Sequence, residues 1–179
     1  KYRTLSEVPR LLMREPHSQA VAKCVYDRQG WSARNGGLEK RFILWASADS
    51  SIEAFCKISE NRHDFARLRY VRQDGMPAFY CPDFLVRTAD TIYLVETKAQ
   101  KDVNHPDVQR KLRAAVTWCA QISELPPALR QDRQWHYVLL GETLCTDWQQ
   151  KGGNLADLLA FSRARETQST NRQAPLTGL

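Results

Sequence analysis

The stretch Tyr80–Lys98, YCPDFLVRTADTIYLVETK, constrains the fold more than any other part of this 179-residue chain. It consists of two runs rich in β-branched and aromatic residues, Phe79–Arg87 and Thr91–Lys98. A short polar turn, Thr88–Asp90, joins the two runs. Strand-forming runs separated by so short a turn predict a β-hairpin.

The turn also predicts which residues of the hairpin face each other. If the loop is centred between residues 89 and 90, Asp83 lies opposite Glu96 and Cys81 lies opposite Lys98. Because side chains alternate along a strand, Asp83, Glu96 and Lys98 then share one face of the sheet. A slip of one residue would separate the two carboxylates.

Two acidic residues placed opposite each other are unfavourable unless something offsets their repulsion. Opposed Cβ atoms lie roughly 5 Å apart, and like charges at that distance destabilise a sheet. A divalent cation would offset the repulsion, since Mg²⁺ binds one or two carboxylates and keeps waters elsewhere. Alternatively, Asp83 and Glu96 are ordinary charges on a solvated strand. The apolar Ile92 and Leu94 on the same face, and Lys98 beside Glu96, favour the metal site.

The residues of this hairpin resemble a known signature. Pro82-Asp83, followed after twelve residues by Glu96-Thr97-Lys98, resembles the motif of the PD-(D/E)XK nucleases. CPDFLVR, YLVETK and the later Thr117-Trp118-Cys119 are similar to the nuclease domain at the C-terminus of type III restriction subunits and related helicase-nucleases. The resemblance runs from about Gly37 to Gly141.

This resemblance implies an α/β fold with a restriction-endonuclease-like core, in which a small mixed sheet is flanked by helices. It implies a Mg²⁺-dependent endonuclease, with Mn²⁺ as a substitute, that hydrolyses DNA phosphodiester bonds. Asp83 and Glu96 would hold the metal, with Glu39 and the carbonyl of Thr97 as further ligands. Lys98 would orient the attacking water or stabilise the transition state.

The resemblance also implies partners. The parent chain would carry a superfamily 2 helicase or ATPase region upstream, and a methyltransferase or specificity subunit would be a further partner. No Gly-rich phosphate loop occurs in these residues, so ATP hydrolysis is not expected here. Two alternatives stay open. One is a nuclease-like domain that binds DNA or a partner without cutting, and the other is an interaction module packed against the motor.

Periodicity and turn residues divide the chain into a linker or domain remnant (1–18), one nuclease-like domain (19–165) and a loose tail (166–179). The central sheet is expected to be an antiparallel meander that starts with Leu68–Arg72, followed by a parallel crossover to Trp135–Leu140. The other predicted elements are a strand at Ala20–Tyr26 and helices at Leu38–Ala48, Ser51–Ser59, Pro106–Cys119, Glu142–Gln150 and Leu155–Arg165.

Two helices carry further candidate residues. On the first helix Glu39 sits beside the apolar stripe, where an ordinary first-turn glutamate favoured by the helix dipole is the simpler interpretation. On the helix that begins at Pro106 the candidates for DNA phosphate contacts are Gln109, Arg110, Lys111 and Arg113. A solvated face is the alternative for that group.

Composition limits the remaining possibilities. The net charge of +6 suits a polyanionic partner. No apolar run is long enough to span a bilayer and no signal peptide is present, so a cytoplasmic parent protein is expected, of which this chain, starting at Lys1, is a fragment. The five cysteines are widely spaced without a zinc-ligand pattern, and four of them lie among apolar residues, which predicts buried, reduced thiols.

Overall fold

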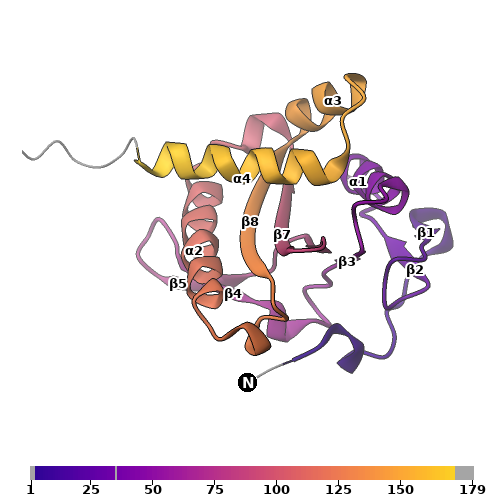
Figure 1. Cartoon of the computed structure of the whole chain (residues 1–179), viewed down its shortest axis with the longest axis horizontal. Coiled ribbons are helices and arrows are strands. Elements are labelled where there is room, and N and C mark those ends of the chain that lie inside the picture. Colours follow the sequence, from indigo (N-terminus) through magenta and orange to yellow (C-terminus); the bar gives the residue numbers. More distant parts are fainter. Residues whose placement is uncertain (1–2, 35, 172–179) are drawn as a thin grey trace, which may run out of the picture.

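The computed structural model describes residues 3–34 and 36–171, with side chains as far as Arg163. Its centre is a mixed four-stranded sheet in the order β3-β6-β7-β8, accompanied by the two-stranded sheets β1-β2 and β4-β5. Helices flank the central sheet, and Figure 1 shows α4 crossing over β8 toward α1, with α2 beside β8. The chain is therefore a mixed α/β protein with a small mixed sheet, as expected.

The elements have the following bounds. The helices are α1 (Gly37–Ala48), α2 (Pro106–Ser123), α3 (Glu142–Gln150) and α4 (Leu155–Asn171). The strands are β1 (Ser18–Ala20), β2 (Arg28–Gly30), β3 (Ala54–Lys57), β4 (Leu68–Val71), β5 (Pro77–Tyr80), β6 (Phe84–Arg87), β7 (Thr91–Lys98) and β8 (Gln134–Gly141).

The predicted hairpin is formed by β6 and β7 in the predicted register. Phe84 pairs with Val95 and Arg87 pairs with Ile92, so continuing the same register by one residue places Asp83 opposite Glu96. The turn is closed by Thr88, whose backbone N–H donates to the carbonyl of Thr91 at 2.9 Å and whose hydroxyl donates to the same carbonyl at 3.2 Å. These hydrogen bonds of the turn thus fix the register in which β6 and β7 pair.

The predicted helix at Ser51–Ser59 is wrong, because this segment contains strand β3. Ile52, Phe55 and Ile58 follow a helical spacing, but Phe55 and Cys56 are both buried, since β3 is covered on both faces. A strand buried on both faces loses the alternation that identifies strands in sequence. Its hydrogen bonds go to β6 on one side, with Phe55 paired with Val86.

The predicted start of the central sheet at Leu68–Arg72 is also wrong. That segment forms β4, which pairs only with β5, with Leu68 opposite Tyr80. Residues 79 and 80, expected at the start of the β6 strand, belong to β5 instead. The turn between β4 and β5 is the predicted one, and Gly75 has the positive φ of +81° that glycine adopts most easily. The β4-β5 hairpin is thus an insertion between β3 and β6.

Strand β8 confirms the predicted parallel crossover. It pairs with β7 in parallel from Thr91 opposite Gln134 to Lys98 opposite Gly141, and α2 makes the connection. The helix begins at Pro106, as predicted. Gly141 packs closely against the loop after β7, since a Cβ there would lie 2.8 Å from Oε1 of Gln100.

The sheet has a separate hydrophobic core on each face. One core joins side chains of α1, α4 and the central strands, and its ring pair Phe42 and Phe84 has centroids 4.4 Å apart. The other core joins α2 to the β4-β5 hairpin and the opposite face of the sheet, through Ala115, Tyr80 and Leu94. Since Glu96 lies two residues after Leu94, its side chain belongs to the α2 face.

The ends of the chain differ from the expected linker and tail. Residues 3–18 contain two short 3-10 helices and pack on the domain, because the hydroxyl of the buried Tyr26 contacts the carbonyl oxygens of Leu5 and Val8 at 3.0 and 2.9 Å. The strand predicted at Ala20–Tyr26 is replaced by the short pair β1-β2. At the other end α4 continues to Asn171, and residues 172–179 lie outside the described part.

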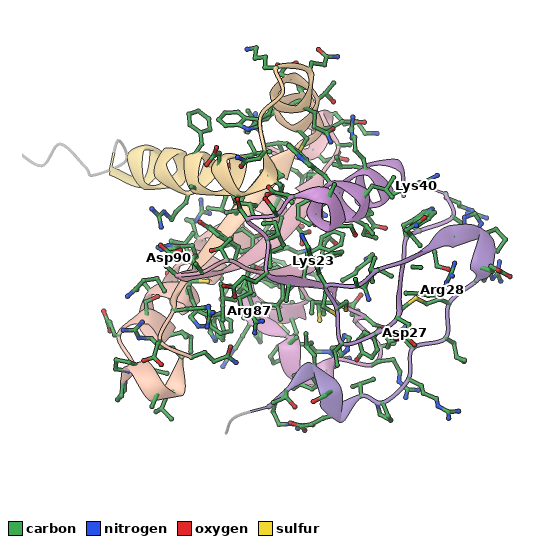
Figure 2. The ribbon with its side chains drawn as sticks, turned by 45° about the vertical axis from the view of Figure 1, so that its right-hand side comes forward. Lys23, Asp27, Arg28, Lys40, Arg87 and Asp90 are labelled. Carbon is green, nitrogen blue, oxygen red and sulfur yellow. The ribbon has the colours of Figure 1, made fainter. Side chains whose placement is uncertain are left out.

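The labelled side chains of Figure 2 mark two sides of the molecule. Asp90, in the β6-β7 turn, lies on one side, and Asp27 and Arg28, at β2, lie on the other.

In the part of the chain that the structure describes, no helix is long and apolar enough to cross a membrane. All five cysteines are free, and Cys56, Cys119 and Cys145 are buried, whereas Cys24 and Cys81 are half-buried.

Candidate active site

The candidate site lies where β7 ends and β6 begins. The last residues of β7 are Glu96, Thr97 and Lys98, and Asp83 immediately precedes β6. Strand β7 is the second inner strand of the sheet, so these residues are held by neighbouring strands on both sides. The structure therefore brings the three predicted catalytic residues to one end of the sheet.

Asp83 is fixed by Thr97. Its Oδ2 accepts two hydrogen bonds, one from the backbone N–H of Thr97 at 2.8 Å and one from Oγ1 of Thr97 at 2.7 Å. The carbonyl oxygen of Asp83 accepts from the N–H of Ile58 at 2.8 Å, which ties it to the end of β3 as well. The other carboxylate oxygen, Oδ1, accepts no hydrogen bond from the residues that the structure describes. Asp83 is thus held firmly and keeps one oxygen for a ligand.

Glu96 is a buried carboxylate with one unpartnered oxygen. The residue is only 4% exposed, and its Oε2 has no hydrogen-bond partner among the described residues. Burial raises the pKa of this carboxyl, the negative charge of Asp83 raises it further, and the opposing charges of Lys98 and Lys111 leave the pKa at about 7. Since nearly all buried polar atoms are satisfied, an orphaned carboxylate oxygen points to a missing proton or cation.

Lys98 binds the other oxygen of Glu96. Its Nζ lies 2.6 Å from Oε1 of Glu96, and its side chain is 28% exposed. Burial lowers the pKa of Lys98, but the charges of Glu96, Asp83 and Asp102 together raise the pKa above its usual value. Lys98 is therefore an ammonium ion at neutral pH, placed beside the carboxylates and within reach of solvent.

Of the four predicted DNA contacts, one reaches this site. Lys111 lies over the rings of Tyr70 and Tyr80, with its Nζ 5.5 and 5.3 Å from their centroids, and its charge lowers the pKa of Glu96. Gln109 is used locally, since its Nε2 donates to the carbonyl of Val103 at 2.8 Å. This difference follows from their positions on α2, because neighbouring helical residues point about 100° apart.

The other two predicted DNA contacts, Arg110 and Arg113, stay available at the surface of α2. Arg113 is exposed and Arg110 is half-buried, and neither side chain forms an ion pair with the described residues. Residues three apart lie on the same side of a helix, so these two guanidinium groups form one basic strip. Their contact with DNA remains a prediction.

Glu39 is not brought together with Asp83 and Glu96. Its Oε1 forms an ion pair with Nζ of Lys57 at 3.1 Å, and its Oε2 accepts from the backbone N–H of Ser32 at 2.9 Å. Helix α1 covers the face of the sheet opposite to that of Glu96. Its role as a metal ligand therefore remains a prediction that requires Lys57 to release it.

The donor set is consistent with a hard divalent cation. Over residues 3–34 and 36–171, no group of three or more His, Cys, Asp or Glu side chains is placed to hold a metal ion. However, Mg²⁺ needs only one or two carboxylates and fills its other positions with water or substrate oxygens. Asp83 and Glu96 each keep one oxygen without a protein partner, so they fit such an ion. The carbonyl of Thr97 remains a predicted further ligand.

The two tyrosine rings that lie beneath Lys111, Tyr70 and Tyr80, were not predicted to belong to the site. Tyr80 is buried, and its hydroxyl donates to the carbonyl of Lys111 at 3.0 Å. The pKa of Tyr80 is raised by burial and by the charge of Glu96, so this tyrosine is a neutral hydrogen-bond donor. The position of Tyr80 directly before Cys81-Pro82-Asp83 could have indicated that it lies near the site. However, Tyr80 was assigned to the strand of β6, whereas it belongs to β5.

Comparison with known proteins adds no relative. No family model, no curated protein and no solved structure matches this chain.

Proposed function

We propose that this domain is a metal-dependent nuclease of the PD-(D/E)XK class that hydrolyses phosphodiester bonds in DNA. The observation that carries the proposal is the grouping of Asp83, Glu96 and Lys98 at one end of β7, where Glu96 has a buried, unpartnered oxygen. Buried carboxylates of this kind, with a strongly perturbed pKa and a specific charge partner, are concentrated at functional sites.

The topology supports the same proposal. Apart from the inserted β4-β5 hairpin, the core elements follow the order α1, β3, β6, β7, α2, β8. A helix, three antiparallel strands, a helix and a parallel strand is the arrangement that the resemblance to PD-(D/E)XK nucleases implies. The first strand of that core is Ala54–Lys57, so the order holds although the wrong segment was assigned to it.

In the proposed mechanism each residue has a defined task. Asp83 and Glu96 would hold Mg²⁺, and Thr97 keeps Asp83 in place. The chemistry that Mg²⁺ supplies at such a site is a lower pKa for water and neutralisation of phosphate charge. The ammonium of Lys98 donates a hydrogen bond to the attacking water or to a phosphate oxygen. Lys111 adds a second positive charge on the α2 side.

The wider setting belongs to the same proposal. The resemblance to type III restriction subunits suggests that a superfamily 2 helicase region of the parent chain delivers DNA to this domain, with a methyltransferase or specificity subunit as a further partner. The net charge of +6 supports a polyanionic substrate.

A cleavage assay tests the proposal. Plasmid and short linear DNA are incubated with the wild-type chain and Mg²⁺ or Mn²⁺, beside Asp83→Ala and Lys98→Ala. The matched controls are Asp74→Ala and Lys101→Ala, which remove an exposed carboxylate and an exposed ammonium outside the site. We expect cleavage by the wild type and both controls, and a loss of at least 100-fold in the two site variants. Equal cleavage by Lys98→Ala and Lys101→Ala would overturn the mechanism.

A nuclease-like domain that binds DNA without cutting is the second candidate. One observation favours it, namely that the described residues offer two carboxylates rather than three and that Lys98 already neutralises one oxygen of Glu96. Under this alternative, DNA binding persists in EDTA and no variant at Asp83 changes it. Binding of labelled DNA without cleavage by the wild type in either metal would support this alternative.

A further inference from the structure

A cavity of about 530 Å³ lies at the end of β3 and the residues that follow it. Residues 11–14, strand β2 with the residues that follow it, and the segment after β3 form its walls. A volume of this size lies within the range of sites that hold small ligands. It is large enough for one nucleotide.

The cavity and the candidate site are connected through the end of β3. Ile58 lines the cavity, and its backbone N–H donates to the carbonyl of Asp83 at 2.8 Å. Lys57, another lining residue, pairs with Phe84 in the register of β3 and β6. A ligand in the cavity would therefore contact the end of β3 that is hydrogen-bonded to the backbone of Asp83.

The lining of the cavity is basic. It includes Arg14, His17, Lys57 and Arg62, and none of the described residues that line it is an aspartate or a glutamate. Glu39 neutralises Lys57 through their 3.1 Å ion pair. Arg14 and Arg62 are exposed, and neither side chain forms a hydrogen bond or an ion pair with residues in the described ranges. Two guanidinium groups thus remain for an anionic ligand, and Arg binds phosphate in a bidentate manner.

An aromatic ring completes the cavity. Trp31 is half-buried in its wall, and Nζ of Lys40 lies 5.2 Å from the centroid of the Trp31 ring. Figure 2 shows Lys40 on α1, on the same side of the molecule as Arg28 of β2. Flat aromatic rings in a basic groove are the usual platforms on which unpaired bases stack.

We propose that this cavity binds one nucleotide with an unpaired base, so that Trp31 stacks on the base and Arg14 and Arg62 hold its phosphates. The inference rests on the proposed nuclease function, since it names the substrate of that site as DNA that is single-stranded beside the cut. A free mononucleotide and a nucleotide within a strand share this chemistry, and the experiment separates the two sources.

Binding without metal tests the proposal independently of cleavage. A fluorescein-labelled oligothymidylate of eight residues is titrated in EDTA with the full chain, with Arg14→Ala, with Arg62→Ala, with Trp31→Leu and with Trp31→Phe. The matched charge control is Lys151→Ala, an exposed cation after α3 outside the cavity. Unlabelled dTMP and a blunt duplex of the same length serve as competitors, and circular dichroism checks the fold of each variant.

The expected outcome has three parts. Trp31→Leu weakens binding by about fivefold or more, whereas Trp31→Phe keeps most of the affinity, because stacking contributes about 1–3 kcal/mol per base. Arg62→Ala weakens binding and reduces the salt slope by about 0.7, the value for one phosphate contact on a single strand. Lys151→Ala leaves both quantities unchanged.

The competitors decide the nature of the ligand. Displacement of the oligonucleotide by dTMP at millimolar concentration identifies a mononucleotide site, and displacement only by longer strands identifies a nucleotide within a strand. Equal affinities of the wild type, Trp31→Leu and Arg62→Ala overturn the proposal, and so does a blunt duplex that competes as well as the single strand. Because no metal is present, a failure here leaves the cleavage assay unaffected, and a failure to cleave leaves this binding result unaffected.

Discussion

Thr97 donates both its backbone N–H and its hydroxyl to the same carboxylate oxygen of Asp83, at 2.8 and 2.7 Å. The two donors come from one residue of β7, whereas the acceptor belongs to the residue before β6. The pair therefore locks the open end of the hairpin. Both hydrogen bonds go to Oδ2, so the second oxygen of Asp83 keeps no hydrogen-bond donor among the described residues.

Replacing Thr97 with Val removes one of these two donors and keeps a β-branched side chain. We expect the free energy of unfolding to fall by about 1.5–3 kcal/mol, the usual contribution of a hydrogen bond to a charged group. Urea denaturation measures it. Thr97→Ser retains a hydroxyl and should lose less stability, so a serine variant as unstable as the valine variant would contradict the role of the hydroxyl.

The raised pKa of Glu96 predicts an effect of pH on stability. With a folded-state pKa of about 7, above the ordinary value of 4.5, the folded state holds a proton that the unfolded state has lost between these pH values. The contribution of Glu96 to stability therefore falls as pH rises from about 4.5 to 7 and stays low above that range. Denaturation in EDTA should show this fall in the wild type relative to Glu96→Gln.

The comparison with Glu96→Gln cancels the other titrating groups. Burial lowers the pKa of His136 to about 4, so this residue makes the protein more stable as pH rises, opposite to Glu96. His136 is present in both proteins and drops out of their difference. A difference that does not change between pH 5 and pH 8 would contradict a raised pKa for Glu96.

A divalent cation should stabilise the folded protein most at high pH. Binding to Glu96 requires its ionised form, so the affinity for Mn²⁺ or Mg²⁺ rises as pH increases through 7. We expect a larger rise in Tm on adding 10 mM MnCl₂ at pH 8 than at pH 6, since ligand binding to the folded state stabilises it. Asp83→Asn and Glu96→Gln should each abolish the shift, and Asp74→Asn should keep it.

Lys111 and Arg113 differ in what they contribute to the site. Lys111→Met keeps an unbranched chain against Tyr70 and Tyr80 but removes the charge near Glu96. We expect the pKa of Glu96 to rise further and cleavage at pH 7 to fall about tenfold. Arg113→Met removes an exposed, predicted phosphate contact from the same helix, so it should leave the pKa of Glu96 unchanged and lower cleavage less than Lys111→Met does. Equal effects of the two variants on cleavage would contradict a specific role of the Lys111 charge beside Glu96.

Phe84, in the core beside the site, is expected to contribute strongly to the free energy of unfolding. Phe84 is fully buried, its ring lies 4.4 Å from that of Phe42, and it follows Asp83 directly. Phe84→Ala should lower the free energy of unfolding by about 3–5 kcal/mol, because it leaves a cavity in the core. The control is Phe79→Ala, a residue that is 63% exposed, for which about 0.5 kcal/mol or less is expected.

The register of the hairpin could be predicted because short-range information determines it. The short polar turn Thr88–Asp90 centres the loop between residues 89 and 90, and this centre determines the pairing of the two strands. Helix α2 was equally accessible, since Pro106 marks its start and its apolar residues repeat with the helical period. In both cases the signal lies within a few residues of the structure it determines.

Strand β3 could not be recognised from its own residues. Ile52, Phe55 and Ile58 have the spacing of a helix face, and the extended form is selected by pairing with β6, about thirty residues later. Two contacts of the site residues could not be predicted for the same reason, because they depend on segments distant in the sequence. The contact between Lys111 and Glu96 depends on how α2 packs on the sheet, and the engagement of Glu39 by Lys57 depends on a strand that was taken for a helix.

The β4-β5 hairpin lies between β3 and β6 in the chain but outside their sheet. The pairing of Lys57 with Phe84 must therefore close a loop that contains the whole hairpin, and this closure brings the segment before Asp83 into place. The entropy cost of closing a loop grows slowly with its length. The chain can thus lengthen, shorten or exchange this hairpin tip with little effect on stability, while Tyr80 at its base keeps contact with α2. The insertion can therefore vary while the neighbouring end of β7, with Glu96 and Lys98, keeps its structure.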